Sequence, residues 1–140
     1  MLFAVSLAAC SGATSPDLEL TAARLRWQQR QPASYDITVS RSCECTPASI
    51  GPVVVAVRDG VVVSRTYVAT GAPVAPTLAD VFPAVEGLFA IITDAQRRHA
   101  ASVVVHYDGE LGFPSVISID YNRQAVDDEF SISANNFVAR

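Results

Sequence analysis

The chain has 140 residues, half of them hydrophobic, with a formal net charge of −4 and three cysteines. This length supports one domain with one core, and a charged fraction of only 17% argues against a disordered protein. A net acidic chain lacks the basic surface that nucleic-acid binding needs, and because all ten basic residues are arginine, Schiff-base catalysis by lysine is excluded.

An apolar run over residues 1–9 ends in small residues just before Cys10. This run is far shorter than the roughly 20 residues that span a bilayer, so it predicts the end of a secretory signal. Leu7-Ala8-Ala9-Cys10 resembles the bacterial lipobox, whose cysteine is diacylated and becomes the new N-terminus. We therefore expect a signal peptide over residues 1–9, lipidated Cys10 with a tether over residues 10–16, and a single domain over residues 17–140.

Signal peptides normally open with Lys or Arg, and this chain opens with neither. We therefore expect the true start codon to lie upstream of Met1. An in-frame stop directly before Met1 in the genomic DNA would contradict this expectation. The alternative to a lipoprotein signal is an accidental apolar N-terminus with a buried Cys10.

If Cys10 carries lipid, Cys43 and Cys45 remain as a pair. An exported protein folds in an oxidising compartment, where an even number of cysteines predicts a disulfide. Residues two apart on a strand have Cα atoms about 6.5 Å apart, near the upper limit for a disulfide. The following Thr46-Pro47 predicts a turn that shortens this distance. Free thiols, a soft-metal site and a redox-active pair are the alternatives.

The first helix is predicted to begin at Ser15 and Pro16, because serine caps helix N-termini and proline favours the first helical position. Pro32 ends it. Trp27 is expected to be a core anchor, with a ligand platform as the alternative. The apolar residues at helical spacing that predict the buried face of this helix are Leu18, Ala22 and Leu25, with Leu20 and Trp27 beside them.

Three strands are predicted next, over residues 35–40, 53–57 and 61–68. Asp59-Gly60 separates the second from the third and is typical of a two-residue hairpin turn. After a Gly/Pro loop, Thr77 and Asp80 are typical of a helix start. The second helix ends near Arg98, and its apolar stripe comprises Val85, Leu88, Phe89 and Ile92.

Three further strands are predicted over residues 102–107, 115–121 and 129–133. The element order is therefore α-β-β-β-α-β-β-β, in which an αβββ unit occurs twice. Each half is too small to close a core alone, so the halves are expected to join. We predict an α+β fold with an antiparallel sheet and both helices on one face.

Residues 106–140 carry the whole net charge, with six acids and two arginines. Such a cluster could bind a hard cation or supply acid and base groups. The acids at 108–110 and 127–129 lie in predicted turns, where carboxylates commonly serve the backbone, and the spacing of a calcium loop is absent. We therefore predict a solvated acidic rim and no metal site.

His106 and Asp108 lie two apart on a predicted strand, as a catalytic base and its orienting partner would. The nucleophile would be Ser115 or Ser118, and neither has a nucleophile-elbow pattern around it. The chain also lacks a phosphate-binding loop, a paired-histidine helix and a nucleotide fingerprint. We predict no catalytic residue and no cofactor, with a small hydrolase around His106 and Asp108 as the weaker alternative.

Several short segments occur in a fixed order: Val57-Arg58-Asp59-Gly60, Glu86-Gly87-Leu88-Phe89, Tyr107-Asp108, Leu111-Gly112-Phe113-Pro114, Ile119-Asp120 and Asp128-Glu129. With Trp27, Tyr35 and Cys43-Glu44-Cys45, they resemble the bacterial family known only as domain of unknown function 6174, over roughly residues 25–133. The family tends to have an aromatic residue where this chain has Glu44. The resemblance implies an exported, frequently lipid-anchored protein and carries over no active site.

Leu111-Gly112-Phe113-Pro114 is the most informative of these segments. Glycine allows positive φ and proline fixes the start of a strand, so the segment is either a shaped hairpin turn or a recognition loop beside the acidic rim. We expect a lipid-anchored protein outside the cytoplasm that binds another envelope protein or a wall component without catalysis. A thiol-redox or metal-handling protein that uses Cys43 and Cys45 is the alternative.

Overall fold

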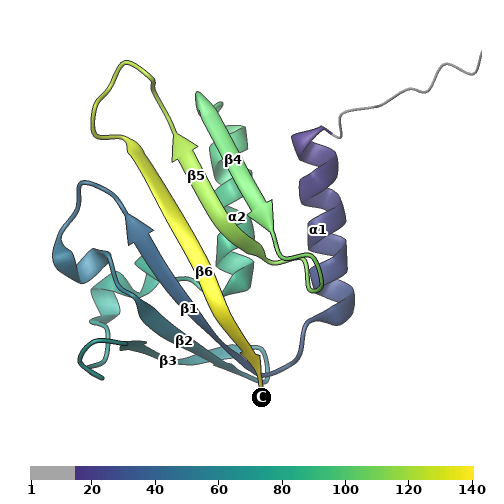
Figure 1. The fold of residues 1–140 in the computed structure, drawn as a ribbon, viewed down its shortest axis with the longest axis vertical. Coiled ribbons are helices and arrows are strands. Elements are labelled where there is room, and N and C mark those ends of the chain that lie inside the picture. The colour runs from purple at the N-terminus through teal and green to yellow at the C-terminus, as the bar shows by residue number, and fades with distance from the viewer. Residues whose placement is uncertain (1–14) are drawn as a thin grey trace, which may run out of the picture.

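The structure, a computed structural model, describes residues 15–140. Its elements in chain order are α1 (Pro16–Arg30), β1 (Tyr35–Ser42), the 3-10 helix η1 (Pro47–Ser49), β2 (Val53–Arg58), β3 (Val61–Tyr67), the 3-10 helix η2 (Pro76–Val81), α2 (Val85–Arg97), β4 (Ser102–Tyr107), β5 (Pro114–Asp120) and β6 (Glu129–Ala139). The α+β class and the predicted order of helices and strands are confirmed, with two short 3-10 helices added (Figure 1).

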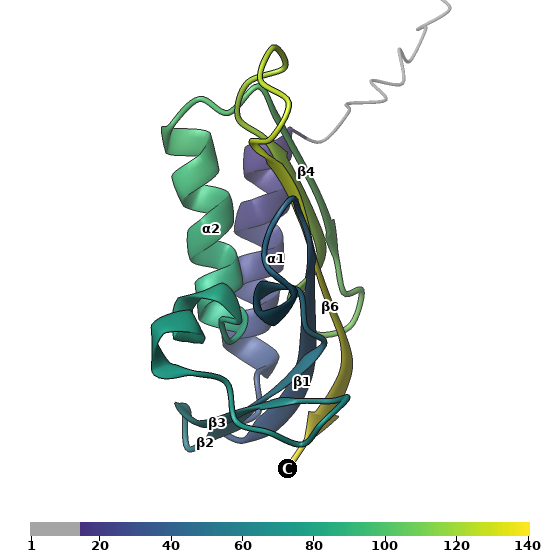
Figure 2. The same cartoon turned by 90° about the vertical axis from the view of Figure 1, so that its left-hand side faces the viewer.

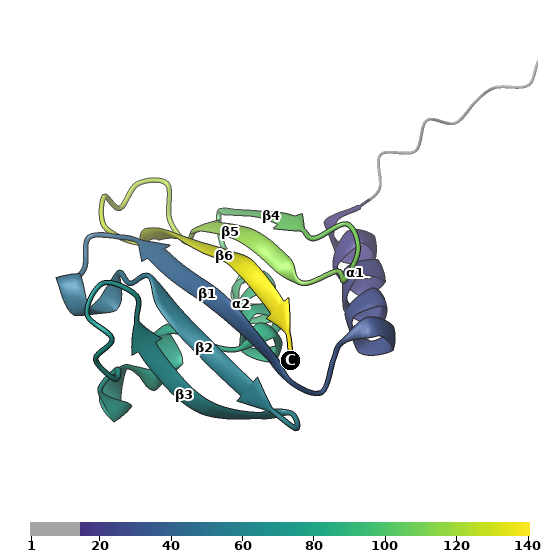
Figure 3. The same cartoon turned by 60° about the horizontal axis from the view of Figure 1, so that its bottom comes forward.

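All six strands form one antiparallel sheet in the order β3-β2-β1-β6-β5-β4. Each half of the chain supplies three neighbouring strands, and the halves join where β1 pairs with β6 (Figure 3). The predicted hairpin turn connects β2 to β3, and Asp59 and Gly60 have φ angles of 49° and 77°, as a tight two-residue turn requires. The two edges of the sheet are therefore β3 and β4.

Both helices cover the same face of the sheet, as predicted (Figure 2). Helix α2 buries its whole predicted stripe against β4, β5 and the core. Helix α1 lies beside α2 and runs in the opposite direction, so that Gln96 near the end of α2 donates to Asp17 near the start of α1 at 3.1 Å. Between them, Arg24 donates to the backbone carbonyl of Phe89 at 3.3 Å.

The predicted buried face of α1 is wrong. Leu18 and Leu25 are 61% and 51% exposed, whereas Leu20, Ala23 and Trp27 are buried. Two apolar stripes compete for the core on this helix. The stripe that contains Trp27 is the one buried, because the indole ring removes far more apolar surface from water than a leucine does.

The N-terminus of α1 forms as predicted. The Oγ of Ser15 accepts a hydrogen bond from the backbone N–H of Leu18 at 3.3 Å, and Pro16 occupies the first helical position. Ser15 is therefore the N-cap of α1, and Pro16 is its first residue.

Trp27 is a core anchor, as predicted, and it attaches α1 to the sheet. Its side chain is fully buried, and its ring lies edge-on at centroid distances of 5.5, 6.4 and 5.9 Å to Tyr35, Phe113 and Phe137. The indole Nε1 donates to Oε1 of Glu86 at 2.9 Å, which satisfies the one polar atom of a buried ring. One cluster thus joins α1, the sheet and the start of α2.

Within residues 15–140, neither α-helix covers the opposite face of the sheet (Figure 2). The half-buried side chains of this open face are mostly small hydroxyls, among them Thr38, Ser40, Ser118, Ser131 and Ser133. The Oγ atoms of Ser40 and Ser133 lie 2.7 Å apart across the β1–β6 junction. The polar half of each alternating strand therefore forms a hydroxyl-rich surface.

Candidate functional site

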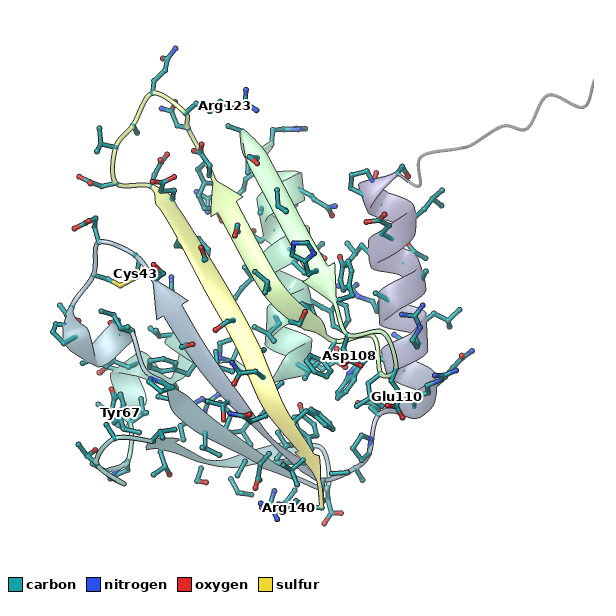
Figure 4. The ribbon with its side chains drawn as sticks, in the orientation of Figure 1. Cys43, Tyr67, Asp108, Glu110, Arg123 and Arg140 are labelled. Carbon is teal, nitrogen blue, oxygen red and sulfur yellow. A yellow bond between two sulfur atoms is a disulfide. The ribbon has the colours of Figure 1, made fainter. Side chains whose placement is uncertain are left out.

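A hollow of about 800 Å³ opens at one end of the sheet, between the loop after β1 and the loop that joins β5 to β6. Cys43 and Arg123 mark these two loops in Figure 4. Serines of four adjacent strands line the hollow: Ser42, Ser131, Ser118 and Ser102. The loops add Cys43 and Glu44 on one side and Arg123, Val126 and Asp127 on the other.

Carboxylates dominate the charge of this hollow. Its lining holds four acids, Glu44, Asp120, Asp127 and Glu129, against the single guanidinium of Arg123. Asp120 of β5 and Glu129 of β6 are direct register partners, so their Cβ atoms are about 5 Å apart on the same face. Like charges in this arrangement destabilise a sheet. A positively charged group in the hollow would relieve that repulsion.

Asp120 also offers a free acceptor. Its Oδ1 is shielded from solvent and has no hydrogen-bond partner within residues 15–140. Arg123, the cation of the lining, donates instead to the carbonyl of Ala101 at 3.3 Å. A shielded acceptor without a donor is costly, and this cost adds to the repulsion between Asp120 and Glu129.

Cys43 and Cys45 form a disulfide at the rim of the hollow, with their Cα atoms 5.3 Å apart. Strand β1 ends at Ser42, so the pair lies in a turn and not on an extended strand, where the distance would be about 6.5 Å. Cys43 is half-buried and lines the hollow, whereas Cys45 is exposed. The disulfide constrains the loop that brings Glu44 to the rim.

The described residues that line this hollow are not grouped as the ligands of a metal ion. Among residues 15–140, no three His, Cys, Asp or Glu side chains are grouped so that they could hold a metal ion. Asp120 and Glu129 are directly opposed, and Glu44 and Asp127 belong to the two loops. Two opposed carboxylates can both accept charge-assisted hydrogen bonds from one ammonium or guanidinium group.

Leu111-Gly112-Phe113-Pro114 forms the turn between β4 and β5, at the opposite end of the sheet from the hollow (Figure 4, near Asp108 and Glu110). Gly112, Phe113 and Pro114 are buried, and Leu111 is half-buried. A Cβ added to Gly112 would overlap the carbonyl oxygen of Ala23, because the turn packs directly on α1. The hairpin-turn interpretation accounts for these four residues, and three of them have no side chain available to a partner.

His106 and Asp108 do not form a catalytic pair. His106 is exposed on β4, and the Asp108 carboxylate accepts from the backbone N–H groups of Glu110 and Leu111 at 3.0 and 2.6 Å. Ser115 Oγ donates to the backbone carbonyl of His106 at 3.1 Å, and not to its ring. The geometry therefore gives the hydrolase alternative no support.

Sequence reasoning missed the opposition of Asp120 and Glu129, although a signal was present. Both acids stand at the ends of two predicted neighbouring strands, and an antiparallel pairing of those strands places them opposite each other. The approach of the disulfide to the same place depends on the β1–β6 pairing, which no local pattern indicates.

The predicted signal peptide over residues 1–9 and the predicted lipidation site Cys10 lie outside the described residues. Over residues 15–140, the structure contains no helix with the length and apolar character needed to cross a membrane.

Comparison with known proteins identifies a family and no characterised relative. No curated protein matches this chain, and no solved structure matches it. The model of a protein family described as "Family of unknown function (DUF6174)" matches residues 19–139, a span that includes the hollow, the disulfide and every strand. The chain therefore belongs to the family of unknown function DUF6174.

Proposed function

We propose that this protein is a non-catalytic binding module of the bacterial cell envelope, anchored to the membrane by lipid on Cys10. Its hollow binds a positively charged group of an envelope protein or of a wall component. The observation that carries the proposal is the opposition of Asp120 and Glu129 inside a hollow with four carboxylates and one guanidinium.

The chemistry of the hollow specifies the kind of ligand. An ammonium or guanidinium group between Asp120 and Glu129 replaces a repulsion by charge-assisted hydrogen bonds. The serine hydroxyls beside them can donate or accept, so they suit the amide and hydroxyl groups of a peptide or a sugar. The ligand is therefore a polar molecule with an amine or guanidine.

Lipidation would keep this site close to the membrane. Five peptide steps separate Cys10 from Ser15, and they span at most about 18 Å. The anchor is tested by expressing the gene with its upstream region, labelling cells with a fatty acid analogue, and comparing the protein with its Cys10→Ser variant. We expect label on the parent protein only, and equal labelling of both would exclude this anchor.

The binding site is tested with purified peptidoglycan sacculi, used either untreated or with their free amines acetylated. We expect the protein to sediment with untreated sacculi and less with acetylated ones. The double variant Asp120→Asn/Glu129→Gln should lose this binding, whereas Asp80→Asn/Glu110→Gln, which changes the net charge equally at exposed positions, should keep it. Equal binding by the two double variants would contradict the site.

A second readout of the same variants does not depend on the ligand. Removing two opposed like charges should raise the free energy of unfolding by about 0.2–1 kcal/mol. The control double variant removes no such pair and should not raise it. If neutralising these two acids stabilises the protein, the fold does not need their charges. Residues that are destabilising in this way are expected at a binding site.

Thiol-redox chemistry is the second candidate, favoured by the exposure of Cys45 at the rim of the hollow. Intact mass under native and reducing conditions separates the candidates. A two-dalton change that reverses at mild potentials supports redox chemistry, and a disulfide that resists glutathione supports a structural constraint.

A further inference from the structure

The two edge strands of the sheet, β3 and β4, differ in whether another part of the chain hydrogen-bonds to their outer side. The outer edge of β3 is covered over residues 65–67 by the following segment: Tyr67 N–H donates to the carbonyl of Ala72 at 2.9 Å, Val74 N–H donates to that of Arg65 at 2.9 Å, and Pro73 lies beside Thr66. The outer edge of β4 pairs with no other strand in the described part of the chain.

Over residues 102–106, strand β4 also lacks the sequence features that normally protect an edge. Natural edge strands carry lysine, proline, inward-facing charges or bulges that prevent pairing with another chain. Residues 102–106 read Ser-Val-Val-Val-His, with no proline and no permanent charge, and their pairing with β5 is regular up to the bulge after His106. Val104 is 50% exposed. This edge is therefore chemically competent to accept a further strand.

A groove of about 600 Å³ runs along this edge, between β4 and α1. Helix α1 stands beyond β4 on the outer side in both Figure 1 and Figure 3. The groove is lined by Asp17 and Glu19 of α1, by Ile92 of α2, and by Val103, Val105 and Tyr107 of β4. It thus combines a free strand edge, an apolar floor and an acidic helix wall.

The shape and charge of the groove indicate which kind of ligand it can bind. A second copy of this domain would bring its own helical layer against α1, which already occupies the space beside β4, whereas a single extended chain fits between them. Glu19 has no ion-pair partner within residues 15–140, and the groove lining contains no arginine. Burial and the nearby Glu19 carboxylate raise the pKa of Tyr107, so its hydroxyl stays protonated and able to donate.

We propose that the β4 edge binds an extended segment of a partner protein, apolar at alternate positions and basic at its ends, which adds to the sheet as a seventh strand between β4 and α1. The main-chain hydrogen bonds would provide affinity and the side-chain contacts specificity, as in other cases of strand addition. This site is separate from the hollow and does not depend on its ligand.

The probe is a fluorescein-labelled peptide, acetyl-Lys-Val-Thr-Val-Thr-Val-Lys-amide, titrated into the protein. One matched peptide is N-methylated at every residue and cannot donate from its backbone, and a second has Glu in place of both Lys. We expect the parent peptide to bind, the N-methylated one to lose at least about tenfold in affinity, and the Glu-ended one to lose about fivefold. Amide hydrogen exchange over residues 102–107 should slow when the parent peptide binds.

Variants identify the edge. Val104→Lys adds a charge at the strand edge and should weaken binding of the parent peptide by at least about tenfold. Val116→Lys is the control, because Val116 is 37% exposed on the same face of β5, one strand inward, and it should leave binding unchanged. Glu19→Arg should reverse the preference between the Lys-ended and Glu-ended peptides.

Several results would overturn the proposal. They are equal binding of the N-methylated peptide, unchanged exchange over residues 102–107, or equal effects of Val104→Lys and Val116→Lys. A dimer detected by sedimentation that Val104→Lys dissociates would show that a second copy occupies this edge, which also overturns it.

Discussion

Gly112→Ala tests how closely the β4–β5 turn is packed on α1. Gly112 has φ of 86°, and an added Cβ would overlap the carbonyl oxygen of Ala23 and lie 3.0 Å from Cβ of Arg26. The left-handed backbone costs alanine about 1–2 kcal/mol, and forcing a methyl group into a packed contact costs about 1–3 kcal/mol. We expect the free energy of unfolding to fall by about 2–5 kcal/mol, a large part of the 5–15 kcal/mol typical of a domain.

The control for this variant is Gly60→Ala. Gly60 has φ of 77°, but no atom lies within 4 Å of its added Cβ, so the control carries the backbone cost alone. Both variants change the freedom of the unfolded chain equally, and their difference therefore measures the contact with α1. Urea unfolding followed by fluorescence of Trp27, the single tryptophan, gives both values. If Gly112→Ala is no less stable than Gly60→Ala, the turn does not pack on α1 as described.

Substitutions at two further positions test the ion pairs of Asp36 with Arg58 and Arg140 and the hydrogen bond of the buried Trp27 ring. Burial alone would raise the pKa of Asp36, but hydrogen bonds from Arg140 and Arg58 lower it below its ordinary value. Its stabilising contribution is therefore present above about pH 4 and is lost as the pH falls through the lowered pKa. Asp36→Asn should reduce the free energy of unfolding by about 1 kcal/mol at pH 7, and urea unfolding should show this difference shrinking below about pH 4; a constant difference would refute the assignment. Glu86→Ala leaves the indole N–H of Trp27 without its acceptor and should cost about 1–3 kcal/mol, whereas Glu86→Gln keeps an acceptor and should cost less in the same assay; equal losses would contradict the hydrogen bond.

Sequence periodicity predicted α2 better than α1 for a physical reason. The stripe of α2 from Val85 to Ile92 is the one apolar face of that helix, so there is a single way to bury it. Helix α1 carries Leu18 and Leu25 on one side and Leu20 and Trp27 on another. A search for apolar residues at helical spacing gives leucine and tryptophan the same weight, whereas burial favours the side with the larger apolar surface.

The candidate site was predictable only in parts. The acids of the last quarter and the cysteine pair were recognised separately, because each has a local signal. Their proximity follows from the pairing of β1 with β6, which brings Ser40 beside Ser133, 93 residues away. Both strands alternate in the ordinary way, and many pairings would satisfy that alternation equally. The pairing of the two halves is therefore determined by how all the strands pack together, and not by the sequence pattern of either strand.

Both proposed binding regions reach the end of the domain at which α1 begins. The start of α1, the hollow and the Ser102 end of the groove lie at one end of the domain, and the turn that contains Gly112 lies at the other (Figures 1 and 4). Ser102, the first residue of β4, lines both regions. In the anchored arrangement that we propose, a short tether at Ser15 turns this end toward the bilayer. Ligands of either region would then be captured in the narrow space beside the membrane, which favours partners that are themselves held at that surface.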